Sequence, residues 1–384
     1  MRLPRSDAFR MRSHYVAAVA SEAIAPALRA ATRLWCRGSS SPAAWRKGLI
    51  IGHNHIGDVL YRTASLPQLS AAFPECEWHY LTSAASAELL KGNPHIAHVL
   101  PFARSDASWD LSADHRRALH HNRYDVALCT NSVGHYPDLV LATGLRIGAR
   151  VGFDYKGLSG LITHPVPISY PSPYPAYMRA VVAHVTGRQP NWSLRPQIVL
   201  SRADEAAACA RWTALGLGSA PVVACTLTTR QQVPVWPPTE YMRALQLVRE
   251  RLEIDVVLCG SARDRGVLEQ AARSFPFSCA ILAGELSLRA FAAFLRRCAA
   301  LLGTDSGPRH LANAVHTPVV FLRGIAGSRI EPGVYCDSEI DAAPNVEFVP
   351  LEDIPRALTA VPPERVAEYL IDILRDRDRV GALT

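Results

Sequence analysis

The sequence predicts an α/β protein made of two Rossmann-like domains, whose parallel sheets face each other across a cleft. Short apolar runs of strand length alternate with helical segments along most of the 384 residues. The alternation occurs twice, and the two sets are separated by the Pro-, Ser- and Tyr-rich stretch Pro165–Pro175 and the aperiodic stretch Arg188–Pro196. Such alternation is typical of parallel sheets with helices on both faces, whose ligands bind at the carboxyl ends of the strands.

The first half is predicted to span residues 48–200. Its strand candidates are Gly48–Ile51, Trp78–Leu81, His98–Phe102 and Tyr124–Thr130, and its helix candidates are Arg62–Phe73 and Ala84–Gly92. The second half is predicted to span residues 201–384. Its helix candidates are Asp204–Leu215, Thr239–Arg251, Asp264–Ser274, Leu288–Arg297 and Pro363–Arg375, and strand candidates include Pro221–Thr226 and Asp255–Gly260. The last helix could return across the first domain.

Residues 1–47 form a basic N-terminal extension. Only Asp7 and Glu22 oppose its arginines, which include Arg2, Arg5, Arg10, Arg12, Arg29, Arg33 and Arg37. The segment Tyr15–Trp35 has helical periodicity, and Pro26 could kink or split that helix. A basic amphipathic helix can lie on an anionic membrane surface. Packing on the protein is slightly favoured, because the apolar face is mostly alanine.

Composition narrows the function classes. The nine cysteines are scattered without close pairs, which favours a reducing cytosol over disulfides or a zinc site. A net charge of +7 suits an anionic partner such as a nucleotide, a phosphorylated glycolipid or an acidic membrane face. The basic residues are dispersed and no nucleic-acid-binding motif is recognisable. No apolar run is long enough for a transmembrane helix.

The most informative segment is GTDSGPRHLAN, residues 303–313, which lies between two apolar runs. It predicts a strand, a tight turn through Thr304, Asp305, Ser306 and Gly307, and a helix that starts near Pro308. Backbone N–H groups at a helix N-terminus, hydroxyls and a glycine together suit a phosphate group. The alternative is that Asp305 or Ser306 merely caps the helix, and the residue types alone favour neither interpretation.

Three further loops follow predicted strands and could carry chemistry. The first, His53–Val59, contains Asp58, which could act as a general base or cap the next helix. Taken alone, the residue pattern favours the cap. In the same loop His53 and His55 lack a third ligand, so no metal site is predicted. The second contains Thr226, Thr228, Thr229 and Arg230, which are potential donors to a diphosphate or simply a polar loop. The third contains Gly260, Ser261 and Asp264, which could meet a ribose or a base, with Asp264 either capping the next helix or accepting from a sugar hydroxyl.

From Lys47 to Arg375 the chain resembles the heptosyltransferases of lipopolysaccharide core assembly, glycosyltransferase family nine. The resemblance lies in IGDVLYRTASLPQLSAAFPECEWHYLTSAASAELLKGNPHIAHVLPF, RVGFDYKGLSGLITHPV, LTTRQQVPVWPPTEYMRAL, LCGSARDRG and GTDSGPRHLANAVHTPVVFLRG, in this order. It implies a GT-B fold and an inverting transfer of heptose from ADP-heptose to a hydroxyl acceptor. The donor is then a substrate, and no cofactor or metal is expected.

The resemblance also implies roles for individual residues. Asp58 matches the catalytic base, and Asp305, Ser306, Gly307 and His310 match the donor-binding turn, with Thr228 and Thr229 as donors to the diphosphate. The acceptor is expected on the first half, where His53, Asn54, His55 and Lys156 are candidate contacts. We expect a cytoplasmic enzyme, with peripheral contact at the inner face of the inner membrane through the N-terminal extension as an option.

Two departures from the family pattern leave alternatives open. The family usually has a lysine shortly before the Trp-Pro that follows the Thr-Thr loop, but this chain reads RQQVPVWPP and offers only Arg230. Another nucleotide sugar, a small-molecule or protein acceptor, or a non-catalytic nucleotide-sugar-binding protein are therefore alternatives. The second departure is the N-terminal extension, which suggests a different acceptor or location.

Overall fold

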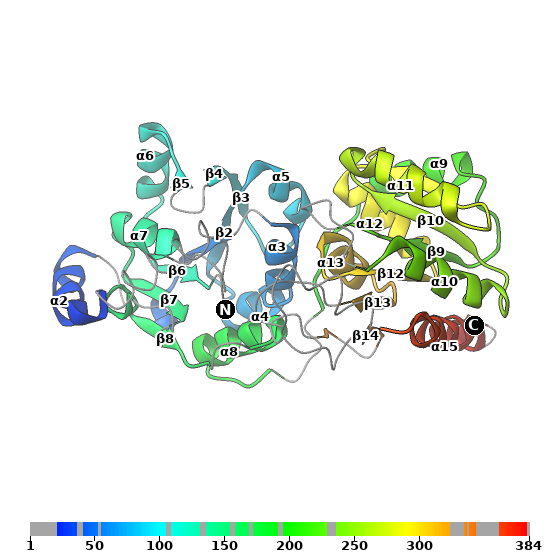
Figure 1. The fold of residues 1–384 in the computed structure, drawn as a ribbon. Helices are drawn as coiled ribbons and strands as arrows, with labels where there is room; N and C mark the ends of the chain where they lie inside the picture. Colours follow the sequence, from blue (N-terminus) through cyan, green and yellow to red (C-terminus); the bar gives the residue numbers. More distant parts are fainter. Residues whose placement is uncertain are drawn as a thin grey trace, which may run out of the picture. The chain divides into compact units, whose positions relative to one another are not determined.

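The computed structural model describes residues 21–36, 41–52, 55–104, 109–130, 136–153, 158–168, 172–190, 195–228, 236–322, 334–335, 338–342 and 361–381. The chain forms two compact units, residues 1–194 and 195–384 (Figure 1). Each unit contains one six-stranded parallel sheet with helices, so the predicted α/β class and the two Rossmann-like domains are confirmed.

The sheet of unit 1 has the order β3-β2-β1-β6-β7-β8, and every pairing in it is parallel. Its strands are β1 (Lys47–Ile51), β2 (Glu77–Thr82), β3 (His98–Pro101), β6 (Val126–Cys129), β7 (Ala149–Phe153) and β8 (His164–Val166). The short strands β4 (Ala103–Arg104) and β5 (Trp109–Asp110) form a separate antiparallel pair. The central strands β1 and β6 are almost entirely buried, as expected for a sheet covered on both faces.

The helices of unit 1 follow the strands in alternation (Figure 1). They are η1 (Pro42–Ala44), α3 (Ile56–Thr63), α4 (Leu66–Ala72), α5 (Ala84–Ala87), η2 (Glu88–Leu90), α6 (Ala113–His121), α7 (Tyr136–Gly144), η4 (Ser159–Leu161) and α8 (Tyr174–Thr186).

The prediction of one helix over Arg62–Phe73 was wrong. The segment is divided between α3 and α4, because Pro67 has no N–H to continue the hydrogen-bond ladder and instead occupies the first turn of a new helix. The single helix predicted over Ala84–Gly92 is α5 followed by the 3₁₀ turn η2. Helix α8 was missed, because it lies between the two stretches that lack periodicity.

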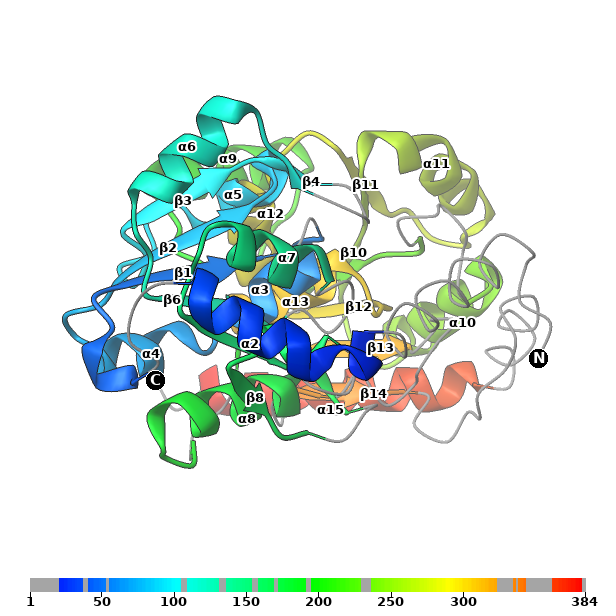
Figure 2. The ribbon, with the colours of Figure 1, turned by 90° about the vertical axis from the view of Figure 1, so that its left-hand side faces the viewer.

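Part of the N-terminal extension packs on unit 1. Helix α2 (Ala25–Trp35) contacts η4, and Figure 2 looks directly onto it. Glu22 accepts hydrogen bonds from Ser159 N and Oγ, at 2.9 and 2.6 Å. A Cβ atom on Gly160 would lie 2.6 Å from the carbonyl oxygen of Ala25, so only glycine permits this close approach. For the described residues, the prediction that this helix packs on the protein is confirmed, whereas residues 1–20 lie outside the described part.

The sheet of unit 2 repeats the same order as β11-β10-β9-β12-β13-β14, again with parallel pairings only. Its strands are β9 (Val222–Cys225), β10 (Asp255–Gly260), β11 (Ala280–Ala283), β12 (Ala300–Thr304), β13 (Val319–Leu322) and β14 (Glu339–Asp341). Its helices are α9 (Arg202–Ala214), α10 (Pro238–Arg249), η5 (Ala262–Asp264), α11 (Arg265–Ser274), α12 (Leu288–Arg297), α13 (Gly307–Ala314) and α15 (Pro363–Gly381).

The core of unit 2 is a continuous cluster of buried side chains from one face of the sheet and from the helices that cover that face. Helix α15 contributes to this cluster with Val366, Leu370 and Leu374 and packs against α10, β12 and β13 of the same unit. Within the described residues, no helix is long and apolar enough to span a membrane.

Candidate active site

Each sheet has one position where the strand order reverses direction along the chain. In unit 1 it lies between β1 and β6, and in unit 2 it lies between β9 and β12. Open parallel sheets bind ligands in the crevice outside the carboxyl ends of the strands at such a switch point. Asp58 follows β1, while Thr228 and the turn Thr304–Gly307 follow β9 and β12. The predicted residues thus lie at the switch points of the two sheets.

Asp58 is the third residue of α3, and its side chain is 17% exposed. The N-cap of that helix is His55, without a side-chain cap bond, so the favoured interpretation of Asp58 as the cap was wrong. The carboxylate lies in the first turn, where the positive end of the helix dipole favours the ionised form. His55 Nδ1 lies 3.3 Å from Asp58 Oδ2, so an imidazole adjoins the carboxylate.

Arg62, which the sequence analysis left without a role, holds this region together. Its side chain is buried, and its guanidinium donates to the carbonyl oxygens of Asp58 at 3.1 Å and Thr130 at 3.2 Å, and to Tyr61 Oη at 3.1 Å. Burial by itself lowers the pKa of Arg62, but the nearby Tyr and Asp side chains outweigh it and the pKa lies above its usual value. Arg62 therefore remains charged and ties the start of α3 to the end of β6.

The turn after β12 leads directly into α13, whose N-cap is Ser306. The Ser306 side chain makes no cap hydrogen bond; its hydroxyl instead contacts Thr304 O and Oγ1 at 3.3 Å. The helix begins at Gly307, one residue before the predicted start. Among the described residues, no side chain caps the first turn, but Pro308 has no N–H and the Arg309 N–H donates to Ser306 O at 3.0 Å. The alternative of a mere capping turn thus has no support from the Ser306 side chain.

Asp305 does not cap α13 either, because its carboxylate pairs with Arg309. Arg309 is fully buried and donates to Asp305 Oδ1 at 2.6 Å and to Glu339 at 2.5 and 3.0 Å. Glu339 also accepts from Asn313 Nδ2 at 2.8 Å and from the backbone N–H of Tyr335 at 2.7 Å. This network fixes the turn against β14.

The sequence analysis missed Arg309, Asn313, Tyr335 and Glu339. The spacing of Asp305 and Arg309 by four residues was a usable signal, since such pairs meet on one helix face. Glu339, which is 30 residues away from Arg309, could not be found by spacing. His310 Nδ1 lies 2.9 Å from Tyr335 Oη and its Nε2 lies 3.8 Å from Asp305 Oδ1, so this predicted residue is part of the same turn.

Asp264 is the third helical residue after the cap Ser261 of η5, and its side chain makes no cap hydrogen bond to α11. It forms a capping box with Ser261, accepting from Ser261 N at 2.8 Å and from its hydroxyl, and it also accepts from Thr228 Oγ1 at 2.9 Å. Gly260 makes room for this arrangement, because a Cβ there would lie 2.9 Å from Asp264 Cβ. The structure thus joins the ends of β9 and β10 through side chains. His53, Asn54, Lys156, Thr229 and Arg230 lie outside the described residues.

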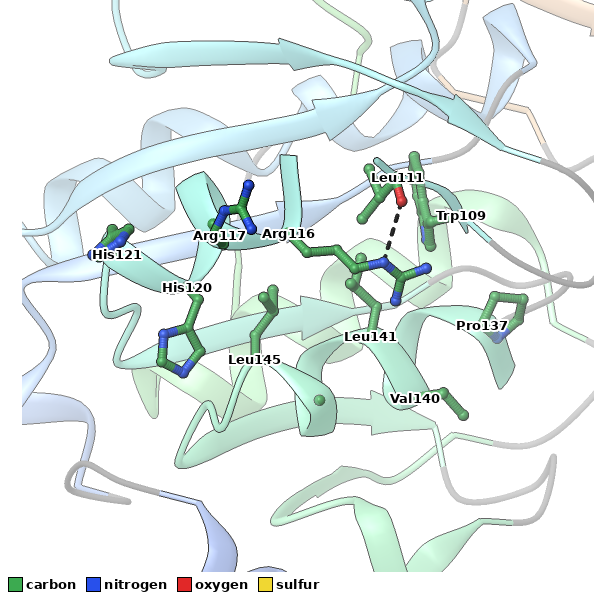
Figure 3. Close-up of a pocket in the computed structure, with 11 residues that line it drawn as sticks. Trp109, Leu111, Arg116, Arg117, His120, His121, Pro137, Val140, Leu141 and Leu145 are labelled. Carbon is green, nitrogen blue, oxygen red and sulfur yellow. Dashed lines mark hydrogen bonds between the residues drawn. The ribbon is translucent and has the colours of Figure 1, made fainter. Parts of the chain in front are cut away.

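A groove of about 470 Å³ lies between α6 and α7 of unit 1 (Figure 3). Arg116, Arg117, His120 and His121 of α6 form one wall, and the other side contains five residues of α7 and its following turn, Pro137, Val140, Leu141, Gly144 and Leu145. Trp109 and Leu111 complete the lining, and no acidic residue is among the eleven lining residues. Figure 3 shows the Arg116 guanidinium between Trp109 and Leu141, while its Nε donates to the carbonyl of Leu111 at 3.2 Å. The groove is therefore basic on one side, where Arg117 is paired with Asp114 just outside the lining, and apolar on the other.

Comparison with known proteins places the chain in a family. The sequence model of glycosyltransferase family 9 (heptosyltransferase) matches residues 112–326, which is more than half of the chain. The lipooligosaccharide heptosyltransferase 2 of Haemophilus influenzae is 24% identical over 302 residues, covering 74% of this chain and 85% of the relative.

Solved structures agree at the level of the fold. The structure of Escherichia coli ADP-heptose lipopolysaccharide heptosyltransferase II has a TM-score of 0.67 and 22% identity, and covers 86% of this chain and 99% of that one. The family 9 glycosyltransferase structure from Veillonella parvula has a TM-score of 0.71 and 16% identity, with coverages of 86% and 98%. The chain is therefore a glycosyltransferase with a GT-B-like fold and belongs to glycosyltransferase family 9, the heptosyltransferases.

Proposed function

We propose that this enzyme transfers a heptose from ADP-heptose to a hydroxyl group of its acceptor with inversion, using Asp58 as general base. The observation that carries the proposal is the location of the residues singled out in the sequence: Asp58 and the Thr304–Gly307 turn both lie at the switch points of their parallel sheets. Inverting transfer needs one base to take the acceptor proton and a means of stabilising the departing nucleoside diphosphate.

Asp58 is suited to the role of base by its surroundings. Its carboxylate is partly exposed, lies in the first turn of α3 and is close to the charged Arg62, whose guanidinium bonds the Asp58 carbonyl. Both the helix dipole and the arginine favour the ionised carboxylate, which is the form that accepts a proton. His55 would orient the carboxylate through the contact at 3.3 Å.

The donor diphosphate would bind to unit 2 at the start of α13. Backbone N–H groups of the first turn, the hydroxyls of Thr304 and Ser306, and the Thr228–Thr229 loop would take up the negative charge that develops on the leaving diphosphate. Asp305 would act indirectly, because its pairing with the buried Arg309 holds the turn in place.

We further propose that Gly260, Ser261 and Asp264 lie beside the nucleoside, and that His310 and Arg230 contribute to the donor site. Arg230 would take the place of the lysine that the family usually has in this loop. No metal takes part in this mechanism, so chelation should leave turnover unchanged. The scattered free cysteines favour the cytoplasm as the place of action.

The groove between α6 and α7 supports a phosphorylated glycolipid as acceptor. Its arginines and histidines suit phosphate groups, while Val140, Leu141 and Leu145 suit apolar chains. Gly144 offers a direct test, because a Cβ there meets nothing within 4 Å. Gly144→Leu should fill the groove and lower transfer to a glycolipid acceptor while donor hydrolysis is unchanged. Gly266→Leu on α11 is the matched control, since that helical glycine is equally open.

The proposed function is tested first by thermal unfolding with ADP, UDP, GDP, CMP and ADP-heptose. A ligand that binds only the folded state at about a hundredfold excess over Kd adds about 2.7 kcal/mol of stability. Selective stabilisation by ADP and ADP-heptose is expected, followed by release of ADP when a core glycolipid acceptor is added. Selective stabilisation by another nucleotide would show that the donor is a different nucleotide sugar. Binding of ADP-heptose without turnover on any acceptor would indicate a non-catalytic binding protein.

A further inference from the structure

Three potential metal ligands lie together at the amino edge of the unit 1 sheet, the edge opposite to the one that carries Asp58. Glu77 is the first residue of β2 and His98 is the first residue of β3. One ligand atom from each of Glu77, His79 and His98 lies within 4.8 Å of the others. The sequence analysis predicted no metal site, because these residues are neighbours only in the paired sheet.

The backbone itself brings the three side chains together. Glu77 and His79 are two residues apart on β2, so both project from the same face of the sheet. His98 is the direct partner of His79 in the parallel register of β2 and β3, which places its side chain beside that of His79. The two imidazole rings accordingly lie with centroids 4.7 Å apart. The cluster is therefore held by strand pairing and does not depend on a mobile loop.

His79 is oriented as a metal ligand would be. Its side chain is buried, and its Nδ1 lies 2.8 Å from the hydroxyl of Tyr124, which can accept the Nδ1 proton. Without a metal ion, the 2.6 Å contact is a hydrogen bond that Nε2–H donates to Glu77 Oε1, with Tyr124 Oη as the donor to Nδ1. Metal binding requires the other tautomer, in which Nδ1–H donates to Tyr124 Oη and the Nε2 lone pair is available to the ion. Metal-bound histidines typically use their second nitrogen in this way, which fixes the ring and the tautomer.

We propose that Glu77, His79 and His98 bind one divalent transition-metal ion, with Zn²⁺ as the best-suited ion and water as its fourth ligand. Two imidazoles and one carboxylate are a frequent ligand set for zinc. Tetrahedral coordination at about 2.0–2.2 Å separates neighbouring ligand atoms by roughly 3.3–3.6 Å. Glu77 Oε1 lies 2.6 Å from His79 Nε2 and 3.7 Å from His98 Nε2, so small movements of the two exposed side chains suffice.

One nearby charge opposes the ion. Lys47 is the register partner of Glu77 on β1, and its Nζ lies 3.9 Å from Glu77 Oε1. Its positive charge lowers the affinity for a cation, so the site is of moderate strength. A bound ion would link the edge strand β3 to β2 and stabilise unit 1 from the edge that the proposed transfer reaction does not use. Substitution of Lys47 by a neutral residue therefore provides a further test, because it should increase the affinity for the cation.

The test is calorimetric titration of the full-length, chelator-treated enzyme with Zn²⁺. All variants carry Cys209→Ser, because this exposed thiol is a second candidate zinc ligand. We expect one Zn²⁺ per chain, a loss of at least about tenfold in affinity for His98→Ala and Glu77→Gln, and a loss of about tenfold for Tyr124→Phe. Lys47→Gln should bind more tightly than the parent. In thermal unfolding, Zn²⁺ should stabilise the parent and, among the variants, only those that still bind the ion.

His121→Ala is the matched control, because it removes an exposed histidine outside the cluster. His98 is 64% exposed in its side chain, so its replacement should leave the fold intact, and thermal unfolding without metal checks this. The proposal is overturned if the parent shows no zinc binding, or if His98→Ala and Glu77→Gln bind Zn²⁺ as tightly as the parent. It is also overturned if His121→Ala weakens binding as much as His98→Ala does.

Discussion

The two sheets share one strand order, yet their switch points hold a buried arginine in opposite ways. In unit 1, Arg62 donates to backbone carbonyls and a phenol, and its neighbouring carboxylates act on it from a distance. In unit 2, Arg309 is enclosed by the carboxylates of Asp305 and Glu339. The second arrangement neutralises the arginine within the protein and fixes a turn. The first leaves the charge of Arg62 without a directly bonded carboxylate, so that it acts on Asp58 from a distance.

The largest expected effect concerns Asp58 itself. Asp58→Asn keeps the shape and removes the proton acceptor, so kcat should fall by about 10²–10⁴-fold if Asp58 is the base. ADP binding, measured by thermal unfolding, should be nearly unchanged. Asp110→Asn, an exposed carboxylate of the same unit, is the control. Normal turnover of Asp58→Asn would show that the difference between the two units has no catalytic meaning.

The two arginines should differ in their effect on stability. Arg309→Gln leaves two buried carboxylates without their partner, which costs about 3–5 kcal/mol of unfolding free energy. Arg62→Gln leaves mainly neutral acceptors unpaired, which costs about 1–3 kcal/mol. Urea unfolding of both variants measures the difference. Equal losses would contradict the view that carboxylate neutralisation distinguishes unit 2.

A smaller effect is expected at the side-chain link between β9 and β10. Thr228→Val removes the hydrogen bond to Asp264 and should lower the unfolding free energy by about 1 kcal/mol. Thr213→Val is the control, because Thr213 is exposed and its hydroxyl donates to a carbonyl of its own helix. If the two variants lose the same stability in urea, the link does not hold the donor loop.

The last expected effect is a dependence on pH, and it arises from the pairing of Asp204 with Arg289 in unit 2. Burial raises the pKa of Asp204, but hydrogen bonds from Arg289 and Ser201 outweigh it and lower the pKa from 3.8 to about 2. A carboxyl whose pKa is lower in the folded state stabilises above its unfolded pKa and loses that contribution as pH falls towards the folded one. The stability advantage of the wild type over Asp204→Asn should thus shrink between pH 4 and pH 2. If the difference in unfolding free energy between the wild type and Asp204→Asn stays constant over this range, the low pKa of Asp204 does not contribute to stability.

Hydrophobic periodicity predicted the α/β fold class and the two sheets. The rule that ligands bind at the carboxyl ends of parallel strands was sufficient to predict the location of Asp58 and of the Thr304–Gly307 turn. Both failed where tertiary contacts decide. The pairing of Arg309 with Glu339 joins residues 30 apart through a strand that carries no distinctive motif. The sequence left Asp264 open as a cap or as a sugar contact, and only the tertiary structure shows that Ser261 and Thr228 donate to its carboxylate oxygens. The cluster of Glu77, His79 and His98 depends on strand register, which no local pattern encodes.

The packing of α2 on η4 constrains the order in which the chain can fold. Glu22 and Ser159 are separated by 137 residues, so α2 cannot dock until that much more chain has been synthesised. At about 5–20 residues per second, translation needs roughly 7–27 s to bridge this separation. During this interval the apolar side of a helix made early is available to chaperones. Ribosome-bound chains that end at residue 150 should therefore leave residues 21–36 open to protease, whereas chains in which residue 190 has emerged should protect them.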